Sequence, residues 1–298
     1  MKNKWTLQTI FISILILLSG CEPVKVLDPK GPQAQTQAKD IMLSIWIMSF
    51  IVLVVFLILG YMLFKYRSSK QSSDYEPPKI KGSVLVELIC VGIPVLIIIF
   101  LSIVSVQSNN KVESAPTGYA NKKPLIIYAT SSDWKWHFSY PEENIETVNY
   151  LYIPTNRPLE FKLYSDGPIT SFWIPQLGGQ KYAMSDMVNT LYLAADVPGE
   201  YMGRNANFSG KGFAENTFNV EAVPENKFNE WVKDVKKTAS PLTKEKFTLL
   251  LKPGHLSELT FTGTHLEYLP PNEGGHKHHS SENEMDSEMD MHSKHSSD

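Results

Sequence analysis

Two long apolar runs in the first third of the chain limit the folds that this sequence can adopt. Residues 41–64 carry no charged side chain, and residues 83–106 carry only Glu87. At about 1.5 Å of rise per residue, a helix of either length crosses a hydrocarbon core of about 30 Å. The segment between them is rich in lysine and arginine, which marks the cytoplasmic side of a membrane. We therefore expect a transmembrane hairpin over residues 41–106, with both ends on the outer face.

The N-terminus has the pattern of an exported protein. Lys2 and Lys4 precede a short apolar run, and small residues then lead to Cys21. This arrangement is typical of a secretory signal peptide, here residues 1–20, and the sequence Leu-Ser-Gly-Cys resembles the bacterial lipobox. We expect a lipid on Cys21 and a short extended leader over residues 21–40. The alternative is an uncleaved signal anchor with a buried, inert cysteine.

Beyond a linker at residues 107–123, the pattern changes to that of a β-sandwich. Residues 124–223 contain short runs rich in aromatic and β-branched residues, separated by glycine and proline turns. A helical arm is expected over residues 224–270, because apolar residues recur there at helical spacing. The apolar side chains on one face of its first helix are Phe228, Trp231, Val232 and Val235.

The last segment, residues 271–298, is polar and rich in histidine and methionine. Such a composition cannot bury a core, so we expect a disordered tail. Both side chains can bind copper or other metals, and two interpretations stay open: weak adventitious binding, or a dedicated role in copper delivery.

Charge and cysteine content exclude other classes of function. The formal net charge is −3, so the chain has no basic field for a nucleic acid. Its two cysteines are Cys21 and Cys90, and neither lies in the soluble half. No disulfide can form in that half, and no thiolate is present there for a copper centre.

Three stretches together resemble subunit II of the haem-copper terminal oxidases. They are the hairpin, the aromatic segment at residues 134–141 (WKWHFSYP) and the segment at residues 171–181 (SFWIPQLGGQK). The resemblance extends from Cys21 to about residue 270. It implies a membrane-anchored protein with a two-helix transmembrane hairpin, an all-β cupredoxin-like sandwich and short C-terminal helices.

The resemblance also locates the copper-binding positions of the family. The cytochrome c oxidases hold a two-copper (CuA) centre with one histidine before the second segment and a loop patterned Cys-x-Glu-x-Cys-x-x-x-His-x-x-Met. Every ligand position differs in this chain. The residues at these positions are Thr170, Asn205, Asn207, Ser209, Phe213 and Asn216. We therefore expect no metal and no other cofactor in this chain.

A chain that keeps this scaffold without copper ligands is similar to the quinol oxidases. Residues 203–210 (GRNANFSG) resemble the Bacillus-type version, which implies menaquinol or another quinol as electron donor. The implied partners are oxidase subunit I, which would hold the haems and CuB, the smaller subunits III and IV, and the lipid bilayer. Cytochrome c is not expected. The expected location is the bacterial cell membrane, with the soluble domain on the outer face.

A rival interpretation is a stand-alone membrane lipoprotein that uses its sandwich to bind a partner or solute. Within the oxidase interpretation, this subunit is structural, and the complex oxidises quinol, reduces oxygen to water and moves protons. The expected quinol site lies mainly in subunit I, so no quinol ligands are assigned here.

Some polar and aromatic residues have two interpretations each. Glu87 either extends to the cytoplasmic surface or, as its family match implies, helps proton uptake into subunit I. Trp134 and Trp136 match an aromatic stretch that receives electrons in the cytochrome-c-using members, but packing is favoured here. His137 and His265, with His255, are too scattered in the sequence to define a site.

Overall fold

The computed structural model describes residues 24–67, 82–116, 118–119 and 122–271. The expected signal peptide, the lipidated Cys21 and the His/Met-rich tail lie outside these residues. So does most of the basic segment that connects the two apolar runs.

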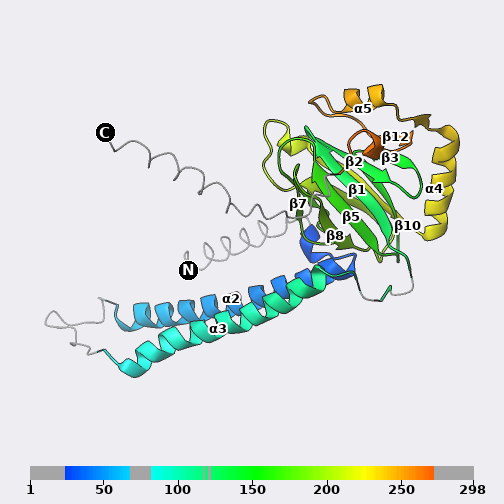
Figure 1. Cartoon of the computed structure of the whole chain (residues 1–298). Helices are drawn as coiled ribbons and strands as arrows, with labels where there is room; N and C mark the ends of the chain where they lie inside the picture. The colour runs from blue at the N-terminus through cyan, green and yellow to red at the C-terminus, as the bar shows by residue number, and fades with distance from the viewer. Residues whose placement is uncertain (1–23, 68–81, 117, 120–121, 272–298) are drawn as a thin grey trace, which may run out of the picture.

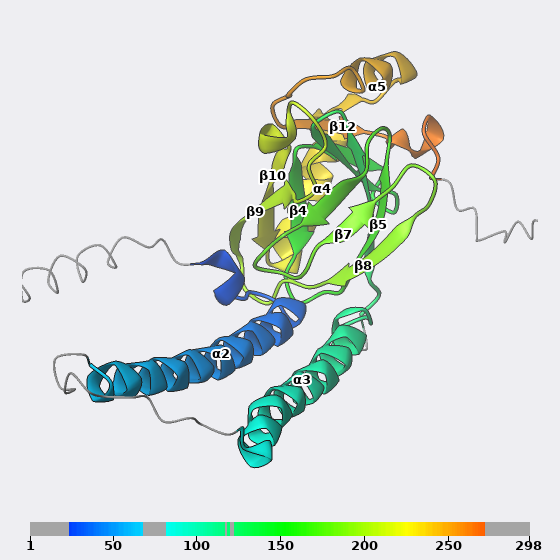
Figure 2. The same cartoon turned by 90° about the vertical axis from the view of Figure 1, so that its left-hand side faces the viewer.

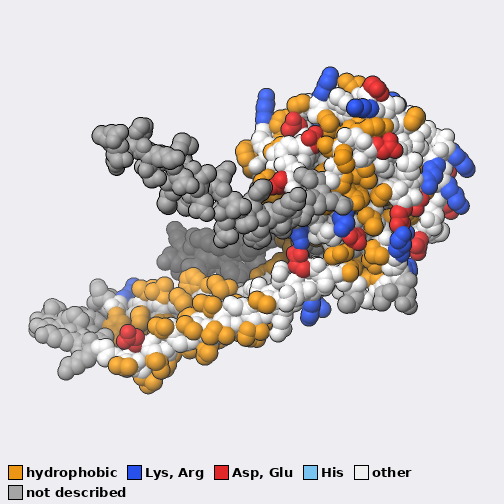
Figure 3. Space-filling model, in the orientation of Figure 1, with side chains coloured by type: hydrophobic (Ala, Val, Ile, Leu, Met, Phe, Trp, Pro, Cys, Tyr) orange, Lys and Arg blue, Asp and Glu red, His pale blue; other side chains and the backbone are white. Residues whose placement is uncertain are grey.

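Two long helices form the first part of the structure. They are α2 (Pro32–Lys65) and α3 (Val84–Val112), after a short turn η1 (Lys25–Leu27). Both are long and apolar enough to cross a membrane. The large apolar side chains of both helices are mostly exposed in this chain. In Figure 3 hydrophobic side chains dominate the surface of the hairpin, whereas the sandwich carries charges of both signs. A continuous apolar surface of this kind is stable only in an apolar environment such as the hydrocarbon core of a membrane.

The first helix begins earlier than the apolar run does. The extended leader expected for residues 21–40 is therefore wrong from Pro32 onward, where the chain is already helical. Proline suits the first helical position because its missing N–H has no intrahelical partner there. The second helix likewise continues to Val112, into the expected linker.

The first turns of α2 are docked on the sandwich rather than separated from it. Gln33, Ala34 and Ala38 are buried there. The backbone N–H of Lys30 donates to the carbonyl of Gln176 at 2.7 Å, and the N–H of Ala34 donates to Leu177 at 3.2 Å. These contacts attach the start of α2 to the sandwich, and the same unbroken helix continues into the apolar hairpin.

The domain is a two-sheet sandwich (Figure 1). One sheet has the order β11-β12-β3-β2-β1-β5-β8, and the other has the order β4-β10-β9-β6-β7. The strands of the sandwich up to residue 223 are β1 (Leu125–Ser132), β2 (Lys135–Tyr140), β3 (Ile145–Val148), β4 (Tyr150–Pro154), β5 (Leu159–Ser165), β6 (Thr170–Trp173), β7 (Lys181–Ala183), β8 (Asn189–Leu193), β9 (Gly199–Asn205) and β10 (Thr217–Val223), with the turn η3 (Phe213–Glu215) before the last. Their burial alternates along several strands, as a half-buried sheet requires.

Aromatic rings fill the space between the sheets. Phe172 and Phe218 are stacked, with ring centroids 5.1 Å apart, and Trp136 meets Phe172 edge to face at 5.2 Å. All three are buried. Offset and edge-to-face pairs of this kind add to the stability gained by burying their area.

The C-terminal arm is only partly helical, which corrects the expectation for residues 224–270. Its elements are α4 (Glu225–Thr238), β11 (Ser240–Pro241), α5 (Lys244–Leu250), β12 (Leu259–Thr262) and η4 (His265–Glu267). The predicted apolar face of α4 is confirmed, since Phe228, Val232 and Val235 are buried. However, β12 pairs antiparallel with β3, so the arm completes a sheet of the sandwich.

Candidate functional site

The positions that match copper ligands come together at one end of the sandwich. Thr170 begins β6, and Asn205 ends the adjacent strand β9, where Phe172 and Asn205 are register partners. The loop that follows contains Asn207, Ser209 and the turn η3, and it leads into β10. The fold therefore brings the positions that the resemblance matches to copper ligands together around one loop.

The amide of Asn205 holds this loop in shape. Its Oδ1 accepts from the backbone N–H of Ser171 at 2.8 Å and of Asn207 at 2.9 Å, and its Nδ2 donates to the Oγ of Ser209 at 2.9 Å. Asn205 is 1% exposed, so these bonds satisfy a buried polar group. A side chain at a position that the resemblance matches to a copper ligand thus organises the loop through hydrogen bonds.

Hydroxyl groups surround Thr170, the position that the resemblance matches to a ligand histidine. The Oγ1 of Thr170 lies 2.6 Å from the Oγ of Ser131, and the same Ser131 donates to the Oγ of Ser165 at 3.0 Å. All three residues are buried. The cluster ties β6 to β1 and β5 across the end of the sandwich.

The indole of Trp134 covers the loop from outside. Its φ angle is 65°, in the left-handed region, and its Nε1 donates to the carbonyl of Ser209 at 3.3 Å. A Cβ on Gly212 would come within 2.3 Å of the ring, so only glycine allows this approach. Trp136 is fully buried in the core. These contacts support the packing interpretation of both tryptophans.

The residues at this end do not fit a copper centre. Copper sites of this kind require thiolate, imidazole or thioether ligands. The side chains here are neutral amides and hydroxyls, together with Phe213, whose ring packs 5.7 Å from that of Phe208. The buried amide of Asn216 has no hydrogen-bond partner among the described residues. No group of three or more histidine, cysteine, aspartate and glutamate side chains within the described ranges could hold a metal.

Glu87 lies in the first turn of α3, at the end of the hairpin that is remote from the sandwich. It is exposed in this chain, and it lies on the same helix as the exposed Cys90 and the internal Pro94. The structure thus leaves the carboxylate accessible to a neighbouring subunit or to the membrane surface. It brings Glu87 near none of the loop positions described above.

A buried cluster of polar side chains around His265 is not predicted by the sequence. His265, in η4, places its Nδ1 2.6 Å from Oε1 of Glu146 and 2.8 Å from the Oγ of Ser139, which also hydrogen-bonds the Glu146 carboxylate. Its Nε2 lies 2.8 Å from Oγ1 of Thr130 and 2.6 Å from the hydroxyl of Tyr164. Histidine and glutamate are fully buried. No short-range pattern signals a contact between residues that are 119 positions apart.

His137 lies beside this cluster, with its ring centroid 6.1 Å from that of His265. Its Nε2 is 2.8 Å from Oγ of Ser132, and its Nδ1 has no partner among the described residues. Burial, and then the nearby charges of His265 and Lys135, hold the pKa of His137 well below its usual value. His137 and His265, which the sequence could not connect, are therefore neighbours, whereas His255 is exposed in a loop.

Lys135, two residues before His137 in β2, hydrogen-bonds the loops around this cluster. Its Nζ donates to the backbone carbonyls of Asp133, Lys252 and Gly254 at 3.0, 2.7 and 3.0 Å. Burial lowers the pKa of this ammonium group, and the charge of Asp133 opposes that shift. The lysine thereby fastens the loop after α5 to the start of β2. We interpret the cluster as structural, because its groups are buried and, apart from Nδ1 of His137, hydrogen-bonded.

Similarity to known proteins covers nearly the whole chain. Residues 28–108 match the family model of the cytochrome c oxidase subunit II transmembrane domain. The chain is 46% identical over 272 residues to quinol oxidase subunit 2 of Bacillus anthracis, covering 91% of this chain and 94% of the relative. It is 50% identical over 268 residues to quinol oxidase subunit 2 of Bacillus subtilis strain 168, covering 89% and 83%.

Among solved structures, one similar chain is the periplasmic domain of subunit II of cytochrome oxidase from Bradyrhizobium japonicum. The match covers 39% of this chain and 96% of that domain, with 23% sequence identity and a TM-score of 0.38.

Proposed function

Because this chain belongs to the quinol oxidase subunit 2 family, we propose that it is the second subunit of a terminal oxidase that oxidises menaquinol and reduces oxygen to water. The observation that carries the proposal is the identity of 46–50% to subunits of that name over about nine tenths of the chain. The chain is membrane-anchored through α2 and α3, in agreement with the transmembrane family model.

The absence of a CuA centre is part of the same proposal. The loop end of the sandwich offers amides and hydroxyls where a copper centre needs sulfur and imidazole. Without that centre, this chain carries no redox group between an external cytochrome c and subunit I. Electrons would pass directly from quinol to the haems and copper of subunit I.

The role left for this chain is structural. The hairpin packs on subunit I, and the sandwich covers the outer surface of that subunit. Docking of α2 on the sandwich supports this role, since it fixes the domain with respect to the membrane helices. Subunits III and IV complete the complex, and a lipid on Cys21 adds a second anchor on the outer face.

Glu87 supplies the one chemical function proposed for the chain, which is proton uptake from the cytoplasmic side. The position of Glu87 in the first turn of α3, exposed and far from the sandwich, supports this role. An ionisable group inside a membrane segment is costly and is usually retained for function. Uptake there would contribute to the proton translocation that accompanies oxygen reduction.

The test is oxygen uptake by the complex purified through this chain. A reduced menaquinol analogue and reduced cytochrome c are supplied in parallel. Uptake with the quinol alone is the expected result. Uptake with cytochrome c would overturn the copper-free route, and a chain that purifies without haem would favour the stand-alone lipoprotein.

A further inference from the structure

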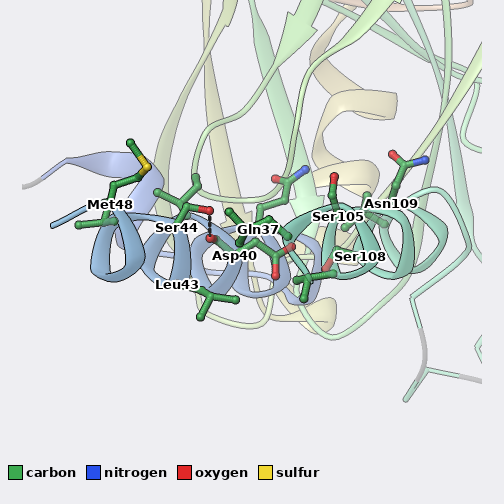
Figure 4. A pocket seen from close by; sticks show the side chains of 13 residues that line it. Gln37, Asp40, Leu43, Ser44, Met48, Ser105, Ser108 and Asn109 are labelled. Atoms are coloured by element: carbon green, nitrogen blue, oxygen red, sulfur yellow. Dashed lines mark hydrogen bonds between the residues drawn. The ribbon is translucent and has the colours of Figure 1, made fainter. Parts of the chain in front are cut away.

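A groove lies between α2 and α3 at the end of the hairpin nearest the sandwich. Its volume is about 590 Å³, within the range of small-molecule sites. Figure 2 shows that the helices diverge away from the sandwich, and residues of both helices line the groove. The polar side chains at its rim are Gln37, Asp40, Ser44, Ser105, Ser108 and Asn109 (Figure 4).

Below this rim the groove becomes apolar. Leu101 and Val104 face it from α3, and Ile45 and Met48 face it from α2. The same Ile45 and Met48 also line a second hollow of about 540 Å³, which continues along α2 to Phe56. From Gln37 to Phe56 the path is about 28 Å long at about 1.5 Å per residue. A polar rim followed by two connected apolar hollows suits an amphiphile, whose headgroup would lie at the rim and whose hydrocarbon chain would lie along the hollows.

The charge of the lining distinguishes between amphiphiles. Asp40 is the one charged side chain among the described residues that line either hollow, and no lysine or arginine lines them. A headgroup with net negative charge would therefore meet a carboxylate without a compensating cation. A primary ammonium group would instead form a charge-assisted hydrogen bond with Asp40.

The uncharged rim supplies partners for the rest of such a headgroup. The hydroxyl of Ser44 already donates to the backbone carbonyl of Asp40 at 2.9 Å. The side chains of Ser105, Ser108 and Asn109 form no hydrogen bond with any described residue, so their donors are available. Ser108 and Asn109 lie about one helical turn from Ser105, on the side nearer the C-terminal end of α3.

We propose that this groove binds a phospholipid with an ethanolamine headgroup, whose ammonium pairs with Asp40 and whose chain follows Ile45 and Met48 toward Phe56. The bound lipid fills the space that the diverging helices leave open. This inference requires only that the hairpin lies in a membrane, and it does not depend on the quinol oxidase activity.

The test is lipid selectivity of the purified complex. The complex is placed in nanodiscs that contain equal amounts of phosphatidylethanolamine and phosphatidylglycerol with added menaquinone, and retained molecules are identified by native mass spectrometry. We expect the ethanolamine lipid to be retained on the wild-type chain. In Asp40→Asn, retention should fall about fivefold to tenfold, the effect of one charge-assisted hydrogen bond.

Two control variants accompany this measurement. Asp40→Glu keeps the carboxylate and should keep the lipid. Asp186→Asn makes the same charge change at an exposed site in the sandwich and should have no effect.

Retention of phosphatidylglycerol or menaquinone in place of the ethanolamine lipid would overturn the proposal. Unchanged retention of the ethanolamine lipid by Asp40→Asn would also overturn it. So would a cross-link from Ser105→Cys to a helix of a partner subunit in a complex without the lipid. Absence of the ethanolamine lipid from the wild-type complex would overturn the proposal even if a variant fails to assemble. Since the readout needs no turnover, its failure is separate from failure of the oxidase assignment.

Discussion

His265 and Glu146 form a fully buried pair, with Nδ1 of the imidazole 2.6 Å from Oε1 of the carboxylate. The backbone N–H of His265 also donates to the other carboxylate oxygen at 3.2 Å. One residue belongs to the C-terminal arm and the other to β3, so the pair fastens the arm to the sheet. Ser139, Thr130 and Tyr164 supply further hydrogen bonds, so the polar groups of this buried pair are satisfied.

Removal of one partner should therefore destabilise the protein strongly. Glu146→Ala leaves the buried His265 and Ser139 without their hydrogen-bond acceptor, and we expect a loss of about 2–5 kcal/mol in the free energy of unfolding, at about 1–3 kcal/mol for each unsatisfied group. Thermal or denaturant unfolding of the purified protein measures this loss. Glu143→Ala is the matched control, because it breaks only the surface pair with Lys236 and should cost less than about 1 kcal/mol. Equal effects of the two changes would contradict the prediction.

Stability should fall in mild acid because of His137. The pKa of this buried imidazole is below its ordinary value of about 6.5, so the unfolded chain binds a proton more readily than the folded chain. Stability is then constant above about pH 7.5 and decreases as the pH falls below about 6.5, by up to about 1.4 kcal/mol per pH unit.

Unfolding free energies measured between pH 5 and 8 test this prediction. In His137→Gln the acid-dependent part that comes from this residue should disappear. His255→Gln, at an exposed histidine, should retain the wild-type slope. A slope that persists in His137→Gln would assign the effect to another group.

The contact between Trp134 and the loop predicts a steric effect at Gly212. In Gly212→Ala the new Cβ would meet the indole at 2.3 Å, so the ring or the loop must shift. We expect a loss of about 1–3 kcal/mol in unfolding free energy and a red-shifted tryptophan emission. Gly60→Ala, in the last third of α2, meets no atom within 4 Å and should leave stability unchanged or slightly raised. An unchanged emission in Gly212→Ala would show that the loop accommodates the methyl group.

Glu87→Ala tests the proposed proton uptake. We expect quinol-driven oxygen uptake to fall about tenfold, equivalent to about 1.4 kcal/mol in the activation free energy, if proton delivery limits turnover. The haem content per complex should not change, because the Glu87 side chain is exposed and packs in no core of the described chain. Glu87→Asp, which keeps a carboxylate, should recover part of the rate. Unchanged turnover in Glu87→Ala would exclude the role.

The architecture could be predicted from the sequence because hydropathy and strand alternation depend only on residues close to one another in the chain. Hydropathy located the two helices, and alternation with turn residues located strands such as β1 and β5. The start of α2 at Pro32 was missed because the polar residues 32–40 are held helical by docking on the sandwich. Tertiary contact of this kind overrides local preference.

The parts that could not be predicted depend on contacts between distant segments. The strand β12 lies within the predicted helical arm, because nothing in residues 259–262 indicates pairing with β3. The same separation concealed the cluster around His265. For the loop end of the sandwich, the resemblance identified the residues, but the arrangement around Asn205 depends on hydrogen bonds that only the structure reveals.

Continuous helix from the membrane into the sandwich has a mechanical consequence. The buried first turns of α2 leave no flexible hinge between the membrane-spanning part and the domain. Membrane helices adjust their tilt when the thickness of the bilayer changes. A tilt of α2 must therefore swing the whole sandwich through the same angle, so that the thickness of the surrounding bilayer sets the height and inclination of the domain above it.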